Sequence, residues 1–168
     1  MLNSKNRFIF EQYNQKLKEM KKIILICFSL LPLMFLGQTY KVGHKQITYT
    51  DPNRNNRSIQ TEIYYPANTA GDNVAISNGQ FPVLIFGHGF VMGWDSYQWL
   101  WDSIVPMGYI MAFPRTEGSI SPSHTEFGLD LRFLNEKFKT ENTTSTSFFY
   151  QHVANTSAIM RSEERRVG

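Results

Sequence analysis

A histidine flanked by two glycines follows an apolar run near the middle of the chain. Residues 83–86 are Val, Leu, Ile and Phe, and the next four residues are Gly87, His88, Gly89 and Phe90. Glycines on both sides of a histidine at the end of a strand let the backbone turn sharply and bring amide N–H groups close to a ligand. A tight turn that needs a positive φ explains the same glycines without any chemistry, so both interpretations stay open at this point.

The distribution of charge argues against a nucleic-acid partner. The formal net charge is +3 and the isoelectric point is about 9.0. The basic excess lies at the two ends of the chain, because residues 23–160 hold eight Lys or Arg against ten Asp or Glu. The part that we expect to fold is therefore mildly acidic and has no basic stripe interleaved with aromatic side chains.

Few residues could bind a metal or attack as a thiol. The single cysteine, Cys27, lies in an apolar run that we expect to be removed, so we predict no disulfide, zinc site or thiol nucleophile. Asp51 and Asn53 could start a cation loop, but no acidic residue stands at its far end, so turn chemistry is the better interpretation. We predict no metal and no organic cofactor.

The first 38 residues are expected to be an upstream extension that ends in a signal peptide at residues 20–37. Two lysines precede about fourteen mostly apolar residues, and the run ends at Gly37, before Gln38. A membrane span and a buried core helix are the alternatives. The run contains Pro32 and is shorter than the ~20 residues that a bilayer requires, which favours a signal peptide.

Cleavage near Gly37 and Gln38 would give a periplasmic or secreted protein that meets the membrane only during export. Residues 1–19 would then be a long positively charged region of the signal or sequence upstream of the true start codon. At the other end, residues 161–168 read RSEERRVG. This string resembles one reading frame of a short-read sequencing adapter, so we expect a non-native tail, with a charged surface tail as the alternative.

Strand patterns dominate the region between residues 39 and 160, which we expect to form one domain. Residues 40–50 and 59–66 alternate apolar with polar residues around a polar turn and predict an antiparallel hairpin with one solvated face. Residues 81–86 and 108–115 lack alternation, which is typical of strands buried on both faces of a parallel sheet. Residues 156–160 are a third such strand.

Two amphipathic helices separate these strands. The first carries its apolar residues at helical spacing and starts after Asp95, with Gln98 three residues on as in a capping box. Its apolar stripe is Tyr97, Leu100, Trp101, Ile104 and Val105. The second helix opens at Ser123, with Glu126 three residues later, and its stripe is Phe127, Leu131, Leu134 and Phe138. The predicted fold is α/β, an edge hairpin followed by doubly wound parallel strands and helices, with ligands bound beyond the carboxyl ends of the strands.

Residues 40–160 resemble the α/β-hydrolase family, and more closely its exported acetylhydrolase-like, dienelactone-hydrolase-like and polyester-hydrolase-like esterases. The resemblance is carried by DPNRNNRSIQTEIYYPA, FPVLIFGHGF, GYIMAFPRTEGS and SHTEFGLDLRFLNE. It implies the N-terminal part of that fold and an oxyanion hole with the Phe90 backbone N–H as one donor. It also implies that the Phe90 side chain lines the acyl pocket and that His88, with Gly87 and Gly89, holds the turn.

Three further side chains are candidates for contact with substrate, namely Trp94, Arg115 and Thr116. Core packing and a surface ion pair are the alternatives for them. The family's Gly-x-Ser-x-Gly turn would stand directly after Met160, where this chain has Arg161 and Ser162. The triad residues are therefore not present in this chain. Ser162, Asp130 and His152 could be combined into a triad on paper, but no glycine turn surrounds Ser162.

These observations lead to three hypotheses. In the first, the full-length parent is an exported serine hydrolase that cleaves small-molecule or polymeric carboxylic esters through an acyl-enzyme. In the second, the domain is a noncatalytic exported protein that uses the same fold to bind a ligand. In the third, which is compatible with the first, the 168-residue chain is itself inactive and folds poorly.

Overall fold

The computed structural model describes residues 12–13, 15–22 and 39–162 and divides the chain into two units, Met1–Gly37 and Gln38–Gly168. In the first unit, residues 15–22 are helical. Most of the expected signal peptide, and the expected tail beyond Ser162, lie outside the described residues. None of the described helices is both long and apolar enough to cross a bilayer.

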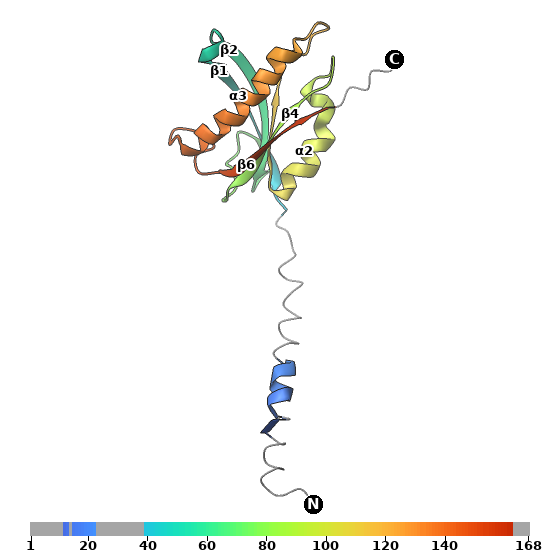
Figure 1. The fold of residues 1–168 in the computed structure, drawn as a ribbon, viewed down its shortest axis with the longest axis vertical. Helices are drawn as coiled ribbons and strands as arrows, with labels where there is room; N and C mark the ends of the chain where they lie inside the picture. The colour runs from blue at the N-terminus through green and yellow to red at the C-terminus, as the bar shows by residue number, and fades with distance from the viewer. Residues whose placement is uncertain (1–11, 14, 23–38, 163–168) are drawn as a thin grey trace, which may run out of the picture. The chain divides into compact units, whose positions relative to one another are not determined.

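The second unit is built on a six-stranded sheet (Figure 1). The strands are β1 (Lys41–Asp51), β2 (Arg57–Ala67), β3 (Gly71–Asp72), β4 (Phe81–Gly87), β5 (Ile110–Pro114) and β6 (Val153–Arg161). Their order in space is β3-β1-β2-β5-β4-β6. Strand β4 pairs in parallel with β5 and β6, whereas β2 is antiparallel to both β1 and β5. The predicted arrangement, an antiparallel hairpin beside parallel strands, is confirmed.

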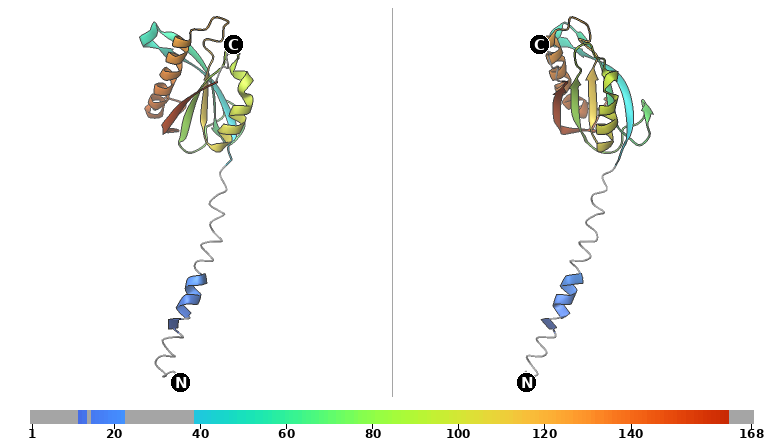
Figure 2. Two further views of the ribbon diagram at one scale, coloured as in Figure 1. Left: turned by 45° about the vertical axis from the view of Figure 1, so that its right-hand side comes forward. Right: turned by 90° about the vertical axis from the view of Figure 1, so that its right-hand side faces the viewer.

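Helices cover both faces of this sheet. The α-helices are α2 (Gln98–Ile104) and α3 (His124–Thr143), and the 3-10 turns are η2 (Pro52–Arg54), η3 (Trp94–Tyr97) and η4 (Val105–Met107). Helices α2 and α3 lie on opposite sides of the sheet, as Figure 2 shows. Each crossover between parallel strands carries one of them, which is the doubly wound arrangement.

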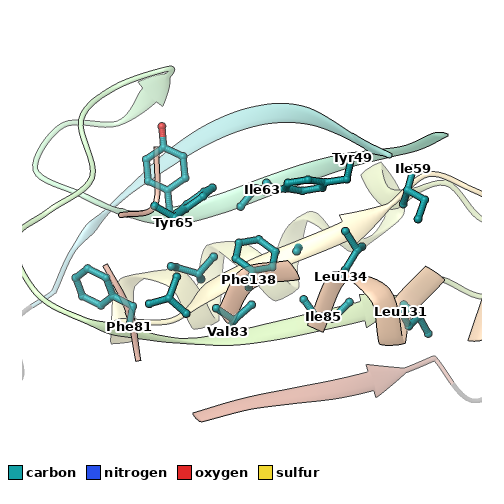
Figure 3. Packing of buried hydrophobic residues seen from close by; sticks show 14 of the residues in the cluster. Tyr49, Ile59, Ile63, Tyr65, Phe81, Val83, Ile85, Leu131, Leu134 and Phe138 are labelled. Atoms are coloured by element: carbon teal, nitrogen blue, oxygen red, sulfur yellow. The ribbon is translucent and has the colours of Figure 1, made fainter. Parts of the chain in front are cut away.

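Two hydrophobic clusters fill the space between the sheet and its helices. Within β4, Val83 and Ile85 belong to the cluster under α3, whereas Phe86 belongs to the cluster under α2. Figure 3 shows the α3 cluster, in which Leu134 and Phe138 pack against the strands. Apolar residues are therefore consecutive in β4 because successive side chains enter different clusters.

The hairpin prediction is confirmed in its pairing and wrong in one respect. Strands β1 and β2 pair from Lys41 opposite Ala67 to Asp51 opposite Arg57. Asp51 accepts a hydrogen bond from the Asn53 N–H at 3.0 Å, which is the predicted turn chemistry. The solvated face runs along β1 but includes only Ser58 and Gln60 of β2, because residues 61–67 of β2 are all buried, so the prediction is wrong for that part of β2.

The start of α3 is confirmed and the start of α2 is not. The Ser123 hydroxyl accepts the Glu126 N–H at 3.2 Å, and the predicted stripe of α3 is buried. Helix α2 begins at Gln98 without a side-chain cap, and Asp95 lies inside the preceding turn η3. The centres of the Trp94 and Trp101 rings lie 5.7 Å apart, and an aromatic pair of this kind contributes about 1 kcal/mol, as much as a typical cap.

Strand β6 begins earlier than the pattern predicts. It pairs with β4 from Val153 opposite Phe81 to Arg161 opposite Gly87, three residues before the predicted start and one after the predicted end at residue 160. Its first residues include Asn155 and Thr156, and asparagine is depleted in strands. Pairing with β4, which local sequence does not encode, extends the strand.

Candidate functional site

The turn after β4 carries a backbone amide, the Phe90 N–H, that has no hydrogen-bond acceptor among the described residues. The Met92 N–H donates to the Gly89 carbonyl at 3.2 Å and closes a β-turn with Phe90 and Val91 at its centre. The Gly89 N–H donates to the Tyr97 hydroxyl at 2.8 Å. Within the described part of the chain, the Phe90 N–H has no hydrogen-bond acceptor, and the Phe90 side chain is 48% exposed.

His88 connects this turn to the loop after β5. Its Nε2 lies 2.8 Å from the Thr116 carbonyl oxygen and its Nδ1 lies 3.0 Å from the Gly89 carbonyl oxygen. Its ring also packs against Phe127 of α3, with the ring centroids 4.6 Å apart. A carbonyl oxygen can only accept a hydrogen bond and a neutral imidazole has one N–H, so the ring donates to one of these two oxygens, and the shorter distance favours donation from Nε2 to Thr116.

The glycines serve close packing and not a positive φ. Neither Gly87 nor Gly89 has a positive φ, so the positive-φ explanation of this motif is wrong. A Cβ at Gly87 would lie 3.0 Å from Leu131 of α3, and one at Gly89 would lie 3.1 Å from the Tyr97 hydroxyl. The left-handed position in this turn is instead Val91, with φ 56°, which is a strained conformation for a β-branched residue.

The carboxyl end of β6 lies beside this turn. The Ser162 N–H donates to the Gly87 carbonyl at 3.0 Å. Ser162, Phe90 and His88 line one small cavity together with residues from the start of α3. A chain that leaves β6 therefore does so next to the free Phe90 amide.

Trp94 and Arg115 lie together, and Thr116 faces elsewhere. Trp94 and Arg115 line a second cavity of about 270 Å³, which His88 also borders. The Arg115 guanidinium lies 6.0 Å from the centre of the Trp94 ring. The Thr116 hydroxyl donates to Asp130 at 2.6 Å, so it acts on a buried carboxylate of α3 and not on this cavity.

Comparison with known proteins supports the architecture. Neither the protein-family models nor the curated protein sequences give a match. A ferulic acid esterase from Streptomyces cinnamoneus superimposes with a TM-score of 0.53 at 13% sequence identity, over 74% of this chain and 52% of that one. The chain has part of an α/β-hydrolase fold.

A second solved structure is more distant. Brefeldin A esterase, a bacterial homologue of human hormone sensitive lipase, superimposes with a TM-score of 0.43 at 14% identity, over 66% of this chain and 30% of that one. This value adds nothing to the assignment of the α/β-hydrolase fold. The chain spans about half the length of the ferulic acid esterase.

The α/β-hydrolase sheet separates the three residues that could be combined into a triad on paper. Ser162 lies at the carboxyl end of β6, whereas His152 precedes that strand and has its Nδ1 3.0 Å from the Gly79 carbonyl oxygen. The nine residues of β6 between them span roughly 30 Å. Asp130 is bound by arginines in the core, so the three side chains do not meet.

Sequence reasoning missed the charged network around Asp130. Asp130 is 0% exposed, and Arg57 donates to its two carboxylate oxygens at 2.8 Å each. Arg54 forms a further ion pair with it at 2.6 Å. Burial alone would raise the pKa of Asp130, but the hydrogen bonds from Arg57, Thr116 and Arg54 outweigh it and lower that pKa.

The same network continues to the loop after β5. Glu117, which has a positive φ of 61°, accepts a hydrogen bond from the Ser123 N–H at 2.6 Å and one from Arg57 at 2.8 Å. These bonds, the Ser123 bond first, lower the pKa of Glu117. The network also includes Thr116, whose hydroxyl donates to Asp130 and whose carbonyl contacts His88 in the Phe90 turn. It therefore positions the loop that lies beside this turn. Two arginines in the predicted hairpin turn were the only sequence signal for it.

Proposed function

We propose that the full-length parent protein is an exported serine hydrolase that cleaves carboxylic esters through an acyl-enzyme. The Phe90 N–H would be one of the two donors of its oxyanion hole. The observation that carries this proposal is the free Phe90 amide at the carboxyl end of β4, between fixed neighbours. The structural likeness to a ferulic acid esterase supports it.

The geometry suits stabilisation of a developing oxyanion. Attack on an ester carbonyl places negative charge on oxygen, and one amide fixed at that oxygen lowers the barrier by about 3 kcal/mol. The neighbouring Gly89 N–H is already bound to Tyr97, and His88 is anchored to the Thr116 carbonyl. The turn is therefore held before a substrate arrives, so little reorganisation is needed during the reaction.

We place the nucleophile on a Gly-x-Ser-x-Gly turn directly after β6 in the parent protein, with the acid and the histidine later in the chain. The proximity of Ser162 to Gly87 supports this placement, because Ser162 and Phe90 line the same small cavity. The 168-residue chain, with Ser162 outside any glycine turn, would then have no esterase activity. The apolar run at residues 20–37 supports export.

Two measurements test this proposal. The first is to sequence the gene across the codon for Met160 and onward. We expect a Gly-x-Ser-x-Gly motif there, and a reading frame without that serine would favour the noncatalytic binding domain. The second is turnover of 4-nitrophenyl acetate by the 168-residue chain, for which we expect none. Turnover that disappears in Ser162→Ala would overturn the placement of the nucleophile.

A further inference from the structure

The Met92 side chain packs on the turn that carries the Phe90 amide. Its Sδ accepts a hydrogen bond from the Tyr97 hydroxyl at 3.4 Å, and the same hydroxyl accepts the Gly89 N–H at 2.8 Å. A Cβ placed on Gly89 would lie 3.1 Å from that hydroxyl and 3.4 Å from Sδ, so both atoms lie against this glycine. The Met92 N–H also closes the turn by donating to the Gly89 carbonyl at 3.2 Å. A change at this sulfur therefore acts directly on the residue before Phe90.

The Met92 side chain is accessible to small molecules. Met92 is 41% exposed and lines the cavity of about 270 Å³ beside His88, whereas Tyr97, which donates to its sulfur, is 6% exposed. Two other methionines allow a comparison, because Met107 in η4 is 64% exposed and Met111 in β5 is 0% exposed. Peroxides oxidise a methionine whose sulfur they can reach. We therefore expect Met92 and Met107 to react with a peroxide and Met111 to be protected.

Oxidation by a peroxide would place a new oxygen atom on the Met92 sulfur. A lone pair of the sulfur attacks one peroxide oxygen, so that an S–O bond forms and the O–O bond breaks. The sulfur is oxidised and the peroxide is reduced. With hydrogen peroxide, the proton on the transferred oxygen moves to the departing oxygen, which leaves as water. The product is a polar sulfoxide, whose oxygen accepts hydrogen bonds more strongly than a thioether sulfur does.

A sulfoxide oxygen that takes over the hydrogen bond from Tyr97 does not fit into the present contact. An O–H···O bond alone requires about 2.7 Å between its two oxygens. Because Sδ and the Tyr97 hydroxyl are only 3.4 Å apart, one of the two side chains has to move. If Tyr97 moves, the Gly89 N–H loses its acceptor, and if Met92 moves, it displaces the turn that its own N–H closes. Either movement displaces the Phe90 amide.

We propose that Met92 is a modification site for peroxides, and that its oxidation to the sulfoxide rearranges the amides of Gly89 and Phe90 so that the turn no longer binds an oxyanion. The modification is reversible, because methionine sulfoxide reductases of two classes, one for each sulfoxide epimer, restore the thioether. The loss of catalysis rests on the proposed esterase function of the parent protein, whereas the oxidation of Met92 and the rearrangement of the turn do not.

Hydrogen peroxide added to the purified 168-residue chain tests this inference without any catalytic step. Peptide mass spectrometry locates each added oxygen, and heteronuclear NMR follows the amide signals of Gly89 and Phe90. We expect Met92 to be oxidised at least about tenfold faster than Met111. Shifted signals of Gly89 and Phe90 should grow in proportion to the oxidised fraction of Met92. Treatment with both classes of reductase should return these signals to their original positions.

Three variants control the experiment. Met92→Leu removes the sulfur at similar volume, so peroxide should leave both amide signals unchanged. Met107→Leu removes the more exposed sulfur in η4 and should leave the peroxide-induced shifts intact, and it stands in if Met92→Leu does not fold. Tyr97→Phe removes the hydroxyl that joins the sulfur to the Gly89 N–H, so Met92 should still be oxidised while the Gly89 signal shifts less.

Three results would each overturn the inference: oxidation of Met92 no faster than that of Met111, unchanged signals of Gly89 and Phe90 once Met92 is oxidised, or shifts that persist in Met92→Leu. Failure of the proposed function looks different. If the reading frame beyond Met160 lacks a nucleophile while oxidation of Met92 still moves both signals, the modification site stands and the esterase proposal falls. If the parent is an active esterase and oxidation of Met92 changes neither the signals nor the activity, the outcome is the reverse.

Discussion

Replacing Asp130 with asparagine removes a negative charge from a fully buried position and leaves the size of the side chain almost unchanged. Asp130 is 0% exposed and lies in α3, whereas its partners Arg54 and Arg57 lie at the hairpin turn before β2 and at its start. The substitution therefore tests how strongly the hairpin is bound to the helix.

The structure sets the size of the expected effect. Breaking a buried ion pair by removing one partner destabilises a protein by about 3–5 kcal/mol. Arg54 keeps an ion pair with Asp51 at 2.7 Å and Arg57 keeps one with Glu117 at 2.8 Å, so we expect the lower end, about 3 kcal/mol. With a urea m-value of about 2 kcal/mol/M, the unfolding midpoint should fall by about 1.5 M.

Urea unfolding followed by tryptophan fluorescence and by circular dichroism measures this difference. Glu136→Gln is the matched control, because it breaks an exposed ion pair with Lys139 on the same helix and should leave the midpoint unchanged. If Asp130→Asn moves the midpoint no more than Glu136→Gln does, the ion pairs of Asp130 with Arg54 and Arg57 contribute little to stability. Our explanation of how the hairpin is bound to α3 is then refuted.

Three other predictions concern pH, backbone strain and the core. Because folding lowers the pKa of Asp130, its carboxylate stabilises the fold above its unfolded pKa of about 4, and this stability is lost as the pH falls through the folded pKa. Acidification below about pH 4 should therefore lower the free energy of unfolding of the unsubstituted chain more than that of Asp130→Asn, as measured by urea titrations. Val91→Asn should raise the thermal midpoint, by relieving about 1 kcal/mol of strain at φ 56°, and an unchanged or lower midpoint would contradict this explanation. Leu134→Ala should lower the free energy of unfolding in urea by about 2–5 kcal/mol, because Leu134 is 0% exposed. Leu129 is 38% exposed, so Leu129→Ala should lower it far less, and equal losses would refute the burial argument.

The parts of the fold that follow from local pattern were predictable from the sequence. Alternation gave the hairpin, a buried apolar run gave β4, and the Ser123 cap with its apolar stripe gave α3. The start of α2 was not predictable from its capping residues, because the packing of Trp94 sets the turn before it. The first residues of β6 form a strand only because they pair with β4.

The contacts around the candidate site were mostly beyond local reasoning. Arg57 and Asp130 are 73 positions apart, and nothing near either residue indicates the other. The contact between His88 and the Thr116 carbonyl was equally unpredictable, because every residue has a backbone oxygen and the residue type does not indicate which one accepts. The position of Phe90 after a buried strand was visible in the sequence, but only the structure shows that the Gly89 N–H has an acceptor, the Tyr97 hydroxyl, while the Phe90 N–H has none among the described residues.

Strand β6 has a consequence for how the chain behaves in concentrated solution. Among the described strands it pairs only with β4, so its other edge has amides and carbonyls without partners in the sheet, and Ile159 on one face of the strand is 45% exposed. Up to Met160 the strand has no proline, lysine or other charged residue to block another strand. Molecules should therefore stack edge to edge into soluble aggregates as the concentration rises, which light scattering would detect, and a lysine in place of Ile159 should suppress this stacking.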